Sequence, residues 1–114
     1  MKDKYIVVVT MCNKKEVVDI ICNNLLEKKL VAGCQVYEAY SKYWWNNEIE
    51  ESKEYRIEFR TKESKFKRIE EEIKKLHDYI TCEITAYELI NGSKEIYKWI
   101  DENVRGERIW NITL

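Results

Sequence analysis

The sequence predicts a single α+β domain over residues 1–114, with two helices covering one face of a four-stranded sheet. The chain has the length of one domain. Segments rich in β-branched and aromatic residues are interleaved with segments whose apolar residues recur at helical spacing. They follow the order strand, helix, strand, strand, helix, strand, and then a C-terminal helix and a short strand. That order is the split β-α-β arrangement of ferredoxin-like folds.

The first strand and helix are predicted near the N-terminus. Tyr5–Met11 is a β-branched run that is apolar on both faces, which indicates a strand buried on both sides. Asn13 precedes Glu16 by three residues, and this pattern resembles a capping box with Asn13 as the N-cap. The helix is expected to run to about Lys29. Its predicted buried residues are Val17 or Val18, Ile21 and Leu25.

A long β-hairpin is predicted next. Ala32-Gly33 lets the chain turn into a strand over Cys34–Trp45, and Asn46-Asn47 is a turn signal because asparagine tolerates the left-handed backbone. Both strands exceed the usual five or six residues, so the hairpin should extend beyond the domain. In the return strand, alternation places Tyr55, Ile57 and Phe59 on one face and Arg56, Glu58 and Arg60 on the other.

The C-terminal half contains the remaining elements. A helix is predicted over Glu63–Leu76, with an apolar stripe of Phe66, Ile69, Ile73 and Leu76. A strand over Cys82–Ile90 follows, and Ser93 is expected to cap a third helix that ends at Gly106. That helix should bury Ile96, Trp99 or Ile100, and Val104. A short terminal strand is predicted over Ile109–Ile112.

The aromatic content of the hairpin predicts self-association. Two helices on one face of the sheet leave the other face to solvent, and this face should then be polar in a monomer. Each large aromatic side chain can bury about 150–250 Å², and exposed apolar patches of this size usually mark an interface. The alternative is that the aromatics pack within the protomer under the terminal segment. The residues concerned are Tyr37, Tyr40, Tyr43, Trp44 and Trp45.

Composition excludes several classes of partner. Twenty basic residues nearly equal twenty-one acidic ones, and the charges are interspersed, as in Glu70-Glu71-Glu72, which reads as part of a solvated helix face. No basic surface or aromatic RNA-binding motif is present, so nucleic acid is not an expected partner. No apolar run approaches the length of a membrane helix and no signal peptide is recognisable, so a cytosolic protein without a membrane partner is expected. The cysteines are expected to be reduced, partly buried hydrophobes: Cys12, Cys22, Cys34 and Cys82.

Catalytic signatures are missing, and we do not expect an enzyme. The sequence contains no Gly-rich phosphate loop, no G-x-S-x-G and no H-E-x-x-H motif. The single histidine, His77, falls where the second helix ends, which favours a capping role. Glu48 and Glu50 point the same way from a strand, and either chelate a hard cation or repel each other in solvent. A softer divalent ion would need the set Cys12, His77, Cys82 and Glu83.

An ordered set of short motifs resembles the CutA family of divalent-cation tolerance proteins. The similarity runs from Ile6 to about Asn103 without apparent gaps. Its motifs are Leu25-Leu26-Glu27-Lys28-Lys29-Leu30-Val31-Ala32, Tyr43-Trp44-Trp45 followed by Ile49-Glu50, Glu54, Arg60-Thr61, His77-x-Tyr79 and Tyr97-Lys98-Trp99-Ile100.

The resemblance implies a ferredoxin-like fold, a homotrimer whose hairpins pair across subunits, and a link to copper and other divalent ions. No cofactor is required; the copper ion is the candidate ligand. Trimers of this kind also resemble PII-like signalling proteins, so a small-ligand sensor or scaffold is the alternative function. The residues implied in the inter-subunit cleft are Trp45, Glu50, Glu54, Arg60, Tyr79 and Glu83. Those implied in the trimer interface are Tyr43, Trp44 and Trp45, and the candidate metal ligands are His77, Cys82 and Glu83.

The sequence departs from the family pattern at several of these positions. The family's His-Pro-Tyr-x-x-Pro-Glu stretch is here His77-Asp78-Tyr79-Ile80-Thr81-Cys82-Glu83, with both prolines replaced. In bacterial members proposed to bind copper, a cysteine matches Thr10 and a histidine matches Leu76. Only Glu83 remains of that set, with Cys12 and Cys82 as the nearby thiols that could substitute.

Overall fold

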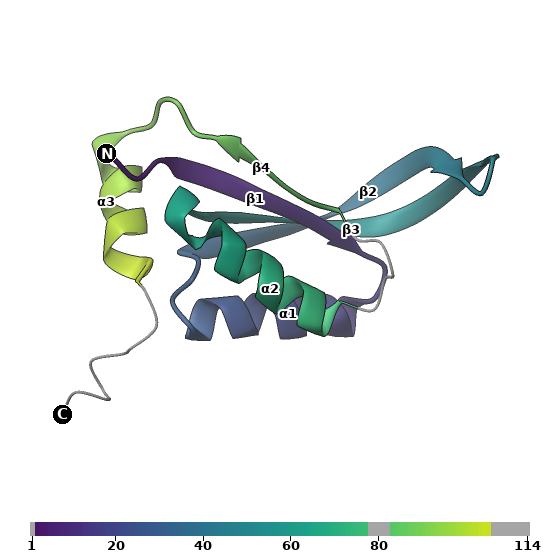
Figure 1. The fold of residues 1–114 in the computed structure, drawn as a ribbon, viewed down its shortest axis with the longest axis horizontal. Coiled ribbons are helices and arrows are strands. Elements are labelled where there is room, and N and C mark those ends of the chain that lie inside the picture. The colour runs from purple at the N-terminus through teal and green to yellow at the C-terminus, as the bar shows by residue number, and fades with distance from the viewer. Residues whose placement is uncertain (1, 78–82, 106–114) are drawn as a thin grey trace.

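The fold was derived from a computed structural model that describes residues 2–77 and 83–105 (Figure 1). The elements are β1 (Tyr5–Cys12), α1 (Lys15–Glu27), β2 (Gly33–Trp45), β3 (Glu48–Lys62), the 3₁₀ turn η1 (Glu63–Lys65), α2 (Phe66–Leu76), β4 (Ile84–Glu88) and α3 (Lys94–Asn103). The predicted order of six elements and a third helix is confirmed. Helix α3 ends at Asn103, with Val104 as its C-cap, so the helix stops before the predicted Gly106. The predicted terminal strand over Ile109–Ile112 lies outside the described residues.

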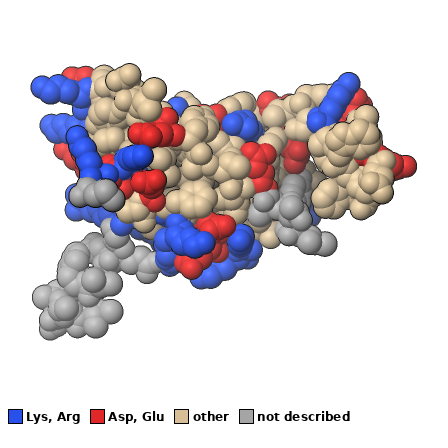
Figure 2. Space-filling view, turned by 45° about the horizontal axis from the view of Figure 1, so that its top comes forward, with Lys and Arg blue, Asp and Glu red and all other residues tan. Residues whose placement is uncertain are grey.

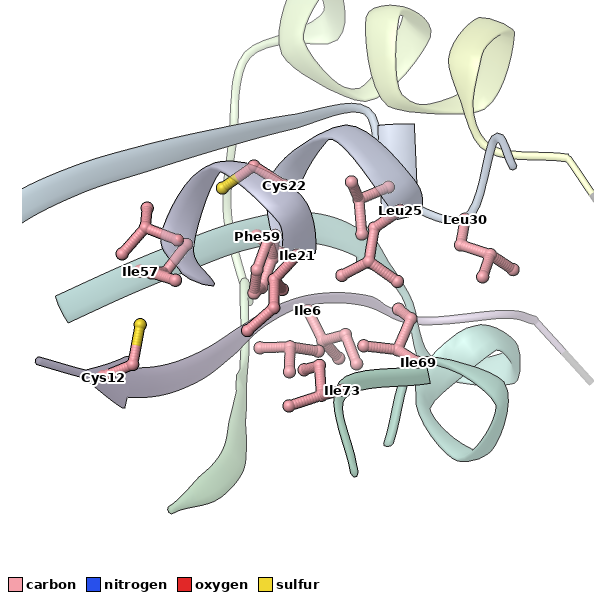
Figure 3. Close-up of a cluster of buried hydrophobic side chains, with 13 residues drawn as sticks. Ile6, Cys12, Ile21, Cys22, Leu25, Leu30, Ile57, Phe59, Ile69 and Ile73 are labelled. Atoms are coloured by element: carbon pink, nitrogen blue, oxygen red, sulfur yellow. The ribbon is translucent and has the colours of Figure 1, made fainter. Parts of the chain in front are cut away.

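The strands form one antiparallel sheet in the order β2-β3-β1-β4, and α1 and α2 cover the same face of it (Figure 1). Between these layers lies a cluster of buried side chains (Figure 3). The cluster consists of Ile6, Val8, Cys12, Val18, Ile21, Cys22, Leu25, Leu30, Val31, Ile57, Phe59, Ile69 and Ile73. The mixed layer architecture and the antiparallel ferredoxin-like sheet are therefore those expected from the sequence.

Helix α1 begins differently from the prediction. Its N-cap is Lys14, whose backbone is extended and which makes no side-chain capping bond, so the Asn13 capping box is wrong. The helix also ends earlier than expected, because Lys29 adopts a left-handed backbone with φ of 59° and the amides of Lys28 and Lys29 turn back onto the last-turn carbonyls. Of Val17 and Val18, the two alternatives for the first buried position of the helix, Val18 is the buried one.

The hairpin turn and the cap of α3 match the sequence interpretation. Asn46 and Asn47 have φ values of 51° and 64°, the pair of positive angles that a two-residue type I′ turn requires. Ser93 Oγ accepts a hydrogen bond of 3.2 Å from the amide of Ile96, as a helix N-cap does. In α3 the buried position is Ile100, while Trp99 is 38% exposed.

Helix α2 contains a buried carboxylate that the charge pattern did not predict. Ile69 and Ile73 are buried as expected, but Glu72 is only 3% exposed, so the solvated interpretation of residues 70–72 is wrong at this position. Glu72 lies three residues after Ile69, on the margin of the apolar stripe. There it accepts hydrogen bonds from Asn24 and Lys28 of the α1 region, at 2.8 and 2.9 Å.

Candidate functional site

The sheet face opposite α1 and α2, called the open face below, is only partly covered. Helix α3 lies over the end that carries the start of β1 (Figure 1). Tyr97 of α3 stacks on Tyr5 with ring centroids 4.2 Å apart, and Asp101 pairs with Lys62 at 2.7 Å. The rest of the face carries no helix among the described residues, although Val7 and Val9 on this face are buried.

A network of charged and phenolic side chains lies on the open face, centred on Glu58. The Tyr37 hydroxyl donates to Glu58 Oε2 at 2.6 Å, and Arg56 Nε donates to the Tyr37 oxygen at 3.0 Å. The hydrogen bond from Tyr37, with help from Arg56, holds the pKa of the Glu58 carboxyl below its usual value. The same bond to Glu58 raises the pKa of Tyr37. The network therefore presents a fixed carboxylate between two strands of the sheet.

Arg60 lies beside this network with part of its guanidinium unsatisfied. Its Nη1 is 3.9 Å from Glu58 Oε1, too far for a hydrogen bond. That nitrogen is buried and has no hydrogen-bond partner among the described residues. A buried N–H without an acceptor is costly, so this position favours an acceptor from outside the described protomer.

The outer part of the β2–β3 hairpin projects beyond the sheet. Strand β1 pairs with β3 only from Tyr55 onward, so residues 39–54, called the hairpin arm below, have no third strand beside them among the described residues. Seven residues of β3 beyond Tyr55 correspond to about 23 Å of strand. Figure 1 shows this arm extending away from the helices.

Both faces of the hairpin arm carry exposed apolar side chains. On the side of α1 and α2, Trp44 is 72% exposed. Ile49, which lies opposite Trp44, and Tyr40, four residues earlier in β2, are exposed as well. On the open-face side, Tyr43 and Trp45 are exposed as well. Figure 2 shows the hairpin end as largely uncharged surface with charged groups at its rim.

An acidic row follows the open-face side of the arm. Glu48, Glu50 and Glu54 occupy alternate positions of β3, and the pairing places Glu48 opposite Trp45 and Glu50 opposite Tyr43. Ser52, between them, donates to Glu54 Oε1 at 3.2 Å. Carboxylates spaced in this way supply oxygen donors on one side of the strand.

The residues predicted for the inter-subunit cleft share one face but are not gathered within one protomer. Trp45, Glu50, Glu54 and Arg60 all belong to the open-face side, yet ten residues of strand, about 33 Å, separate Glu50 from Arg60. Tyr79 lies outside the described residues. Of the predicted interface residues, Tyr43 and Trp45 lie on the open-face side and Trp44 on the opposite side.

The candidate metal ligands lie near the end of β1. His77 Nε2 donates to the carbonyl of Met11 at 2.5 Å, and Glu83 Oε2 accepts from the Thr85 hydroxyl at 3.1 Å. Cys82 lies outside the described residues. Among the described residues no group of three or more His, Cys, Asp and Glu side chains is close enough to hold a metal ion. A metal bound by three or more such groups would need donors beyond this part of the protomer.

Two arrangements went unrecognised in the sequence. The Tyr37–Arg56–Glu58 network was recoverable in part, because a two-residue turn at residues 46–47 fixes the register that places Tyr37 opposite Arg56. The proximity of Cys22 to Cys34 connects a helix with a strand, and no sequence spacing encodes it.

Comparisons with known proteins identify the family of the chain. The model of the family described as "CutA1 divalent ion tolerance protein" matches residues 6–103. The chain belongs to the CutA1 family. A CutA1 relative, the divalent-cation tolerance protein CutA of Archaeoglobus fulgidus, is 38% identical over 84 residues, covering 74% of this chain and 82% of its own. The CutA of Thermotoga maritima is 38% identical over 95 residues, covering 83% of this chain and 93% of its own.

Solved CutA1 structures share the fold. The solved structure of the periplasmic divalent cation tolerance protein CutA from Archaeoglobus fulgidus superposes with a TM-score of 0.85 at 33% identity, covering 89% of this chain and 99% of that one. CutA1 from a psychrotrophic Shewanella also gives 0.85, at 26% identity, covering 93% of this chain and all of the other. The described helices of the present CutA1 chain include none that is long and apolar enough to cross a membrane.

Proposed function

We propose that the chain acts as a non-catalytic homotrimer that binds divalent cations, copper among them, between its subunits and so contributes to cation tolerance. The exposed apolar surface of the hairpin arm carries this proposal. Trp44 is 72% exposed and Trp45 49% exposed in the protomer. Exposed aromatic surface on an extended hairpin is typical of an interface, and a second chain that covers the arm removes it from water.

The acidic row provides the chemical argument for a cation. Glu48, Glu50 and Glu54 project from the side of the arm that also carries Trp45. Within the described protomer these carboxylates are not joined by enough further donors for a metal site. An adjacent subunit that packs along the arm would add donors and lower the dielectric around them, which strengthens the attraction between carboxylates and a cation.

The first experiment measures assembly and cation binding separately. Sedimentation velocity should give a trimer, and calorimetric titration at neutral pH with Cu²⁺, Zn²⁺ or Co²⁺ should show binding in the micromolar range or tighter. The double variant Glu50→Gln/Glu54→Gln should weaken binding at least tenfold, because it removes two of the charged donors.

The matched control is Glu51→Gln, because Glu51 lies on the other side of the arm and pairs with Lys42 at 3.1 Å. It should bind cations as the unaltered protein does. An intact trimer that binds none of the three ions would contradict the proposal.

A small anionic ligand in the cleft, as in a PII-like sensor, is the second candidate, and Arg60 favours it. Its buried Nη1 has no acceptor among the described residues, and an anionic oxygen would supply one. A thermal-shift screen with nucleotides and carboxylate metabolites tests this function. A ligand at 100 times its Kd should stabilise the protein by about 2.7 kcal/mol, and Arg60→Met should abolish the shift. A flat screen would count against a sensor.

A further inference from the structure

Strand β4 lies at an edge of the sheet, and no strand among the described residues pairs with its outer side. The strand order is β2-β3-β1-β4, and Figure 1 shows β4 beside β1. The amide of Leu89 donates to the carbonyl of Tyr5 at 2.9 Å. In an antiparallel pair the bonded positions alternate, so every second residue of β4 turns its backbone away from β1. The outward amides and carbonyls are those of Ile84, Ala86 and Glu88.

A groove of about 510 Å³ lies along this edge, between β4 and the start of α2. Its apolar lining comes from Ile6, Phe66 and Ala86, and Lys4 and Lys67 add positive charge. Phe66 is only partly buried, and Ala86 is exposed although its partner in β1 belongs to the core. A free strand edge beside an apolar groove is suited to one kind of occupant, an extended segment. Its backbone bonds to the edge while alternate side chains enter the groove.

The end of the sequence has the pattern of such a segment. Apolar and polar residues alternate as Trp110-Asn111-Ile112-Thr113-Leu114. An extended backbone would place the three apolar side chains on one side and the two polar ones on the other, and aromatic and β-branched residues are favoured in strands. These residues lie beyond the range 6–103 that the family model matches. Neither the proposed assembly nor the proposed cation site uses them.

The last described residue shows where this segment starts. The amide of Arg105 donates to the carbonyl of Lys29 at 2.7 Å, and Lys29 lies shortly before Gly33, the first residue of β2. The strand register places Gly33 and Glu88 at the same end of the sheet. Three strand spacings, about 14 Å, separate β2 from β4. An extended chain from Arg105 to Trp110 spans up to about 17 Å, so the segment can reach the edge of β4.

We propose that residues 110–114 add a strand to the sheet of their own protomer, antiparallel to β4, with the side chains of Trp110 and Ile112 in the groove. The segment arrives at the end of the sheet where β4 finishes, which sets the antiparallel direction. Placing Ile112 opposite Ala86 puts Trp110 opposite Glu88, where the indole can lie against the lysines of the groove. An exposed edge invites pairing with other chains. The added strand covers this edge and leaves the hairpin arm as the surface for assembly.

Residue-resolved amide hydrogen exchange, followed by NMR on the full chain, tests the added strand. The amides of Ala86 and Glu88 should exchange slowly in the unaltered protein and at least tenfold faster in Ile112→Asp, which places a charge in the groove. Thr113→Asp is the matched control, because it places the same charge on the other side of the segment, and it should leave both rates unchanged. The amide of Leu89, which is bonded to β1, should stay protected throughout. Equal rates for Ala86 and Glu88 in the unaltered protein and in Ile112→Asp would overturn the proposal.

A second measurement identifies the protomer from which the strand comes. In Ala86→Cys/Ile112→Cys the two Cα atoms should lie about 5.5 Å apart, within the range of a disulfide. Mild oxidation should link them within one chain, so that the protein migrates as a monomer on a denaturing gel without reductant and peptide mass spectrometry recovers the linked pair. The matched control, Ala86→Cys/Asn111→Cys, directs the thiols to opposite sides and should form no link. A link between two chains, or equal linking in both variants, would overturn the proposal.

Both measurements are independent of the proposed function. Neither uses a residue of the hairpin arm or of the acidic row. A protein that sediments as a monomer, or that binds no divalent cation, should still protect the amides of Ala86 and Glu88 and form the same internal link. The added strand and the cation-binding trimer can therefore fail separately.

Discussion

Glu72 is the residue whose environment departs furthest from what its chemistry suggests. Its carboxylate is 3% exposed and joins α2 to α1 through Lys28 and Asn24, while Arg68 and Lys75 approach it from its own helix. The hydrogen bonds from Lys28 and Asn24 hold the pKa of the Glu72 carboxyl far below its usual value. The carboxylate is therefore charged in the folded protein even in mild acid.

Glu72→Gln should destabilise the protein in a pH-dependent way. At neutral pH the loss should be about 1–3 kcal/mol, since hydrogen bonds between charged groups are removed. Because the folded-state pKa is depressed, the contribution of Glu72 is present above its unfolded-state pKa, about 4.3. It is lost as pH falls below that value, where the unfolded chain binds the proton more readily. Urea denaturation from pH 7 to pH 3 at one protein concentration measures this.

The matched control is Glu71→Gln, an exposed neighbour on the same helix. It should change stability by less than about 0.5 kcal/mol and keep the acid dependence of the unaltered protein. If the stability of Glu72→Gln falls in acid as steeply as that of the unaltered protein, the buried carboxylate of Glu72 is not the source of the acid dependence.

Single-residue environments were the part of the structure that the sequence predicted least well. Spacing shows which residues share a face, and it correctly assigned Ile69 and Ile73 to the core. Spacing does not show which residues of a neighbouring helix contact a side chain at the margin of that face. For this reason Glu72 was assigned to solvent, and the approach of Cys22 to Cys34 was not anticipated.

At the scale of elements, local chemistry explains both the successes and the failure. The Asn46-Asn47 turn and the Ser93 cap depend on backbone angles and a side-chain bond within a few residues, which the sequence encodes directly. Asn13 has a suitable side chain for a cap, but the chain enters α1 one residue later, at Lys14. A capping pattern therefore identified the helix and misplaced its first residue.

Substitutions at Asn47 should separate backbone strain from side-chain effects. Its φ of 64° is in the left-handed region, which costs a β-branched residue about 1–2 kcal/mol. Asn47→Val should lower the free energy of unfolding by about that amount, while Asn47→Gly should preserve or raise it. Thermal denaturation of the three proteins measures the difference.

Lys53→Val is the comparison for this experiment, because it places the same side chain at an exposed, extended position of β3. It should change stability by less than about 0.5 kcal/mol. Equal losses for Asn47→Gly and Asn47→Val would show that the turn does not require positive φ.

At the scale of the whole molecule, the sheet and its helices were predictable from the sequence, whereas the homotrimer stays a prediction. The alternation of β3 assigned Ile57 and Phe59 to the core correctly, and the element order gave the topology. The open face and the arm remain partly exposed in the protomer. Spacing within one chain identifies such a surface but carries no information on what covers it.

Trp44→Ala and Trp45→Ala should weaken assembly before they affect any bound ion. Each substitution removes a large exposed aromatic side chain from the hairpin arm. Truncating a tryptophan that is a hot spot of an interface costs about 2 kcal/mol of binding free energy. Sedimentation velocity across a dilution series should show dissociation at concentrations at least tenfold higher than for the unaltered protein.

Ile20→Ala is the control, because Ile20 is a similarly exposed apolar residue on α1, 53% accessible and remote from the arm. Its assembly should be unchanged. If both tryptophan variants sediment and melt as the unaltered protein does, the arm is not the interface.

The sheet order β2-β3-β1-β4 also has a consequence for the time course of folding. The hairpin joins strands that are neighbours along the chain, so it closes a small loop and can form within microseconds. Strand β1 must instead find Lys62 and Glu88, which are far away in sequence, and closing such long loops is the slower step. The aromatic arm is therefore expected to exist before the rest of the sheet, and newly made chains would present it to one another while their cores are still incomplete.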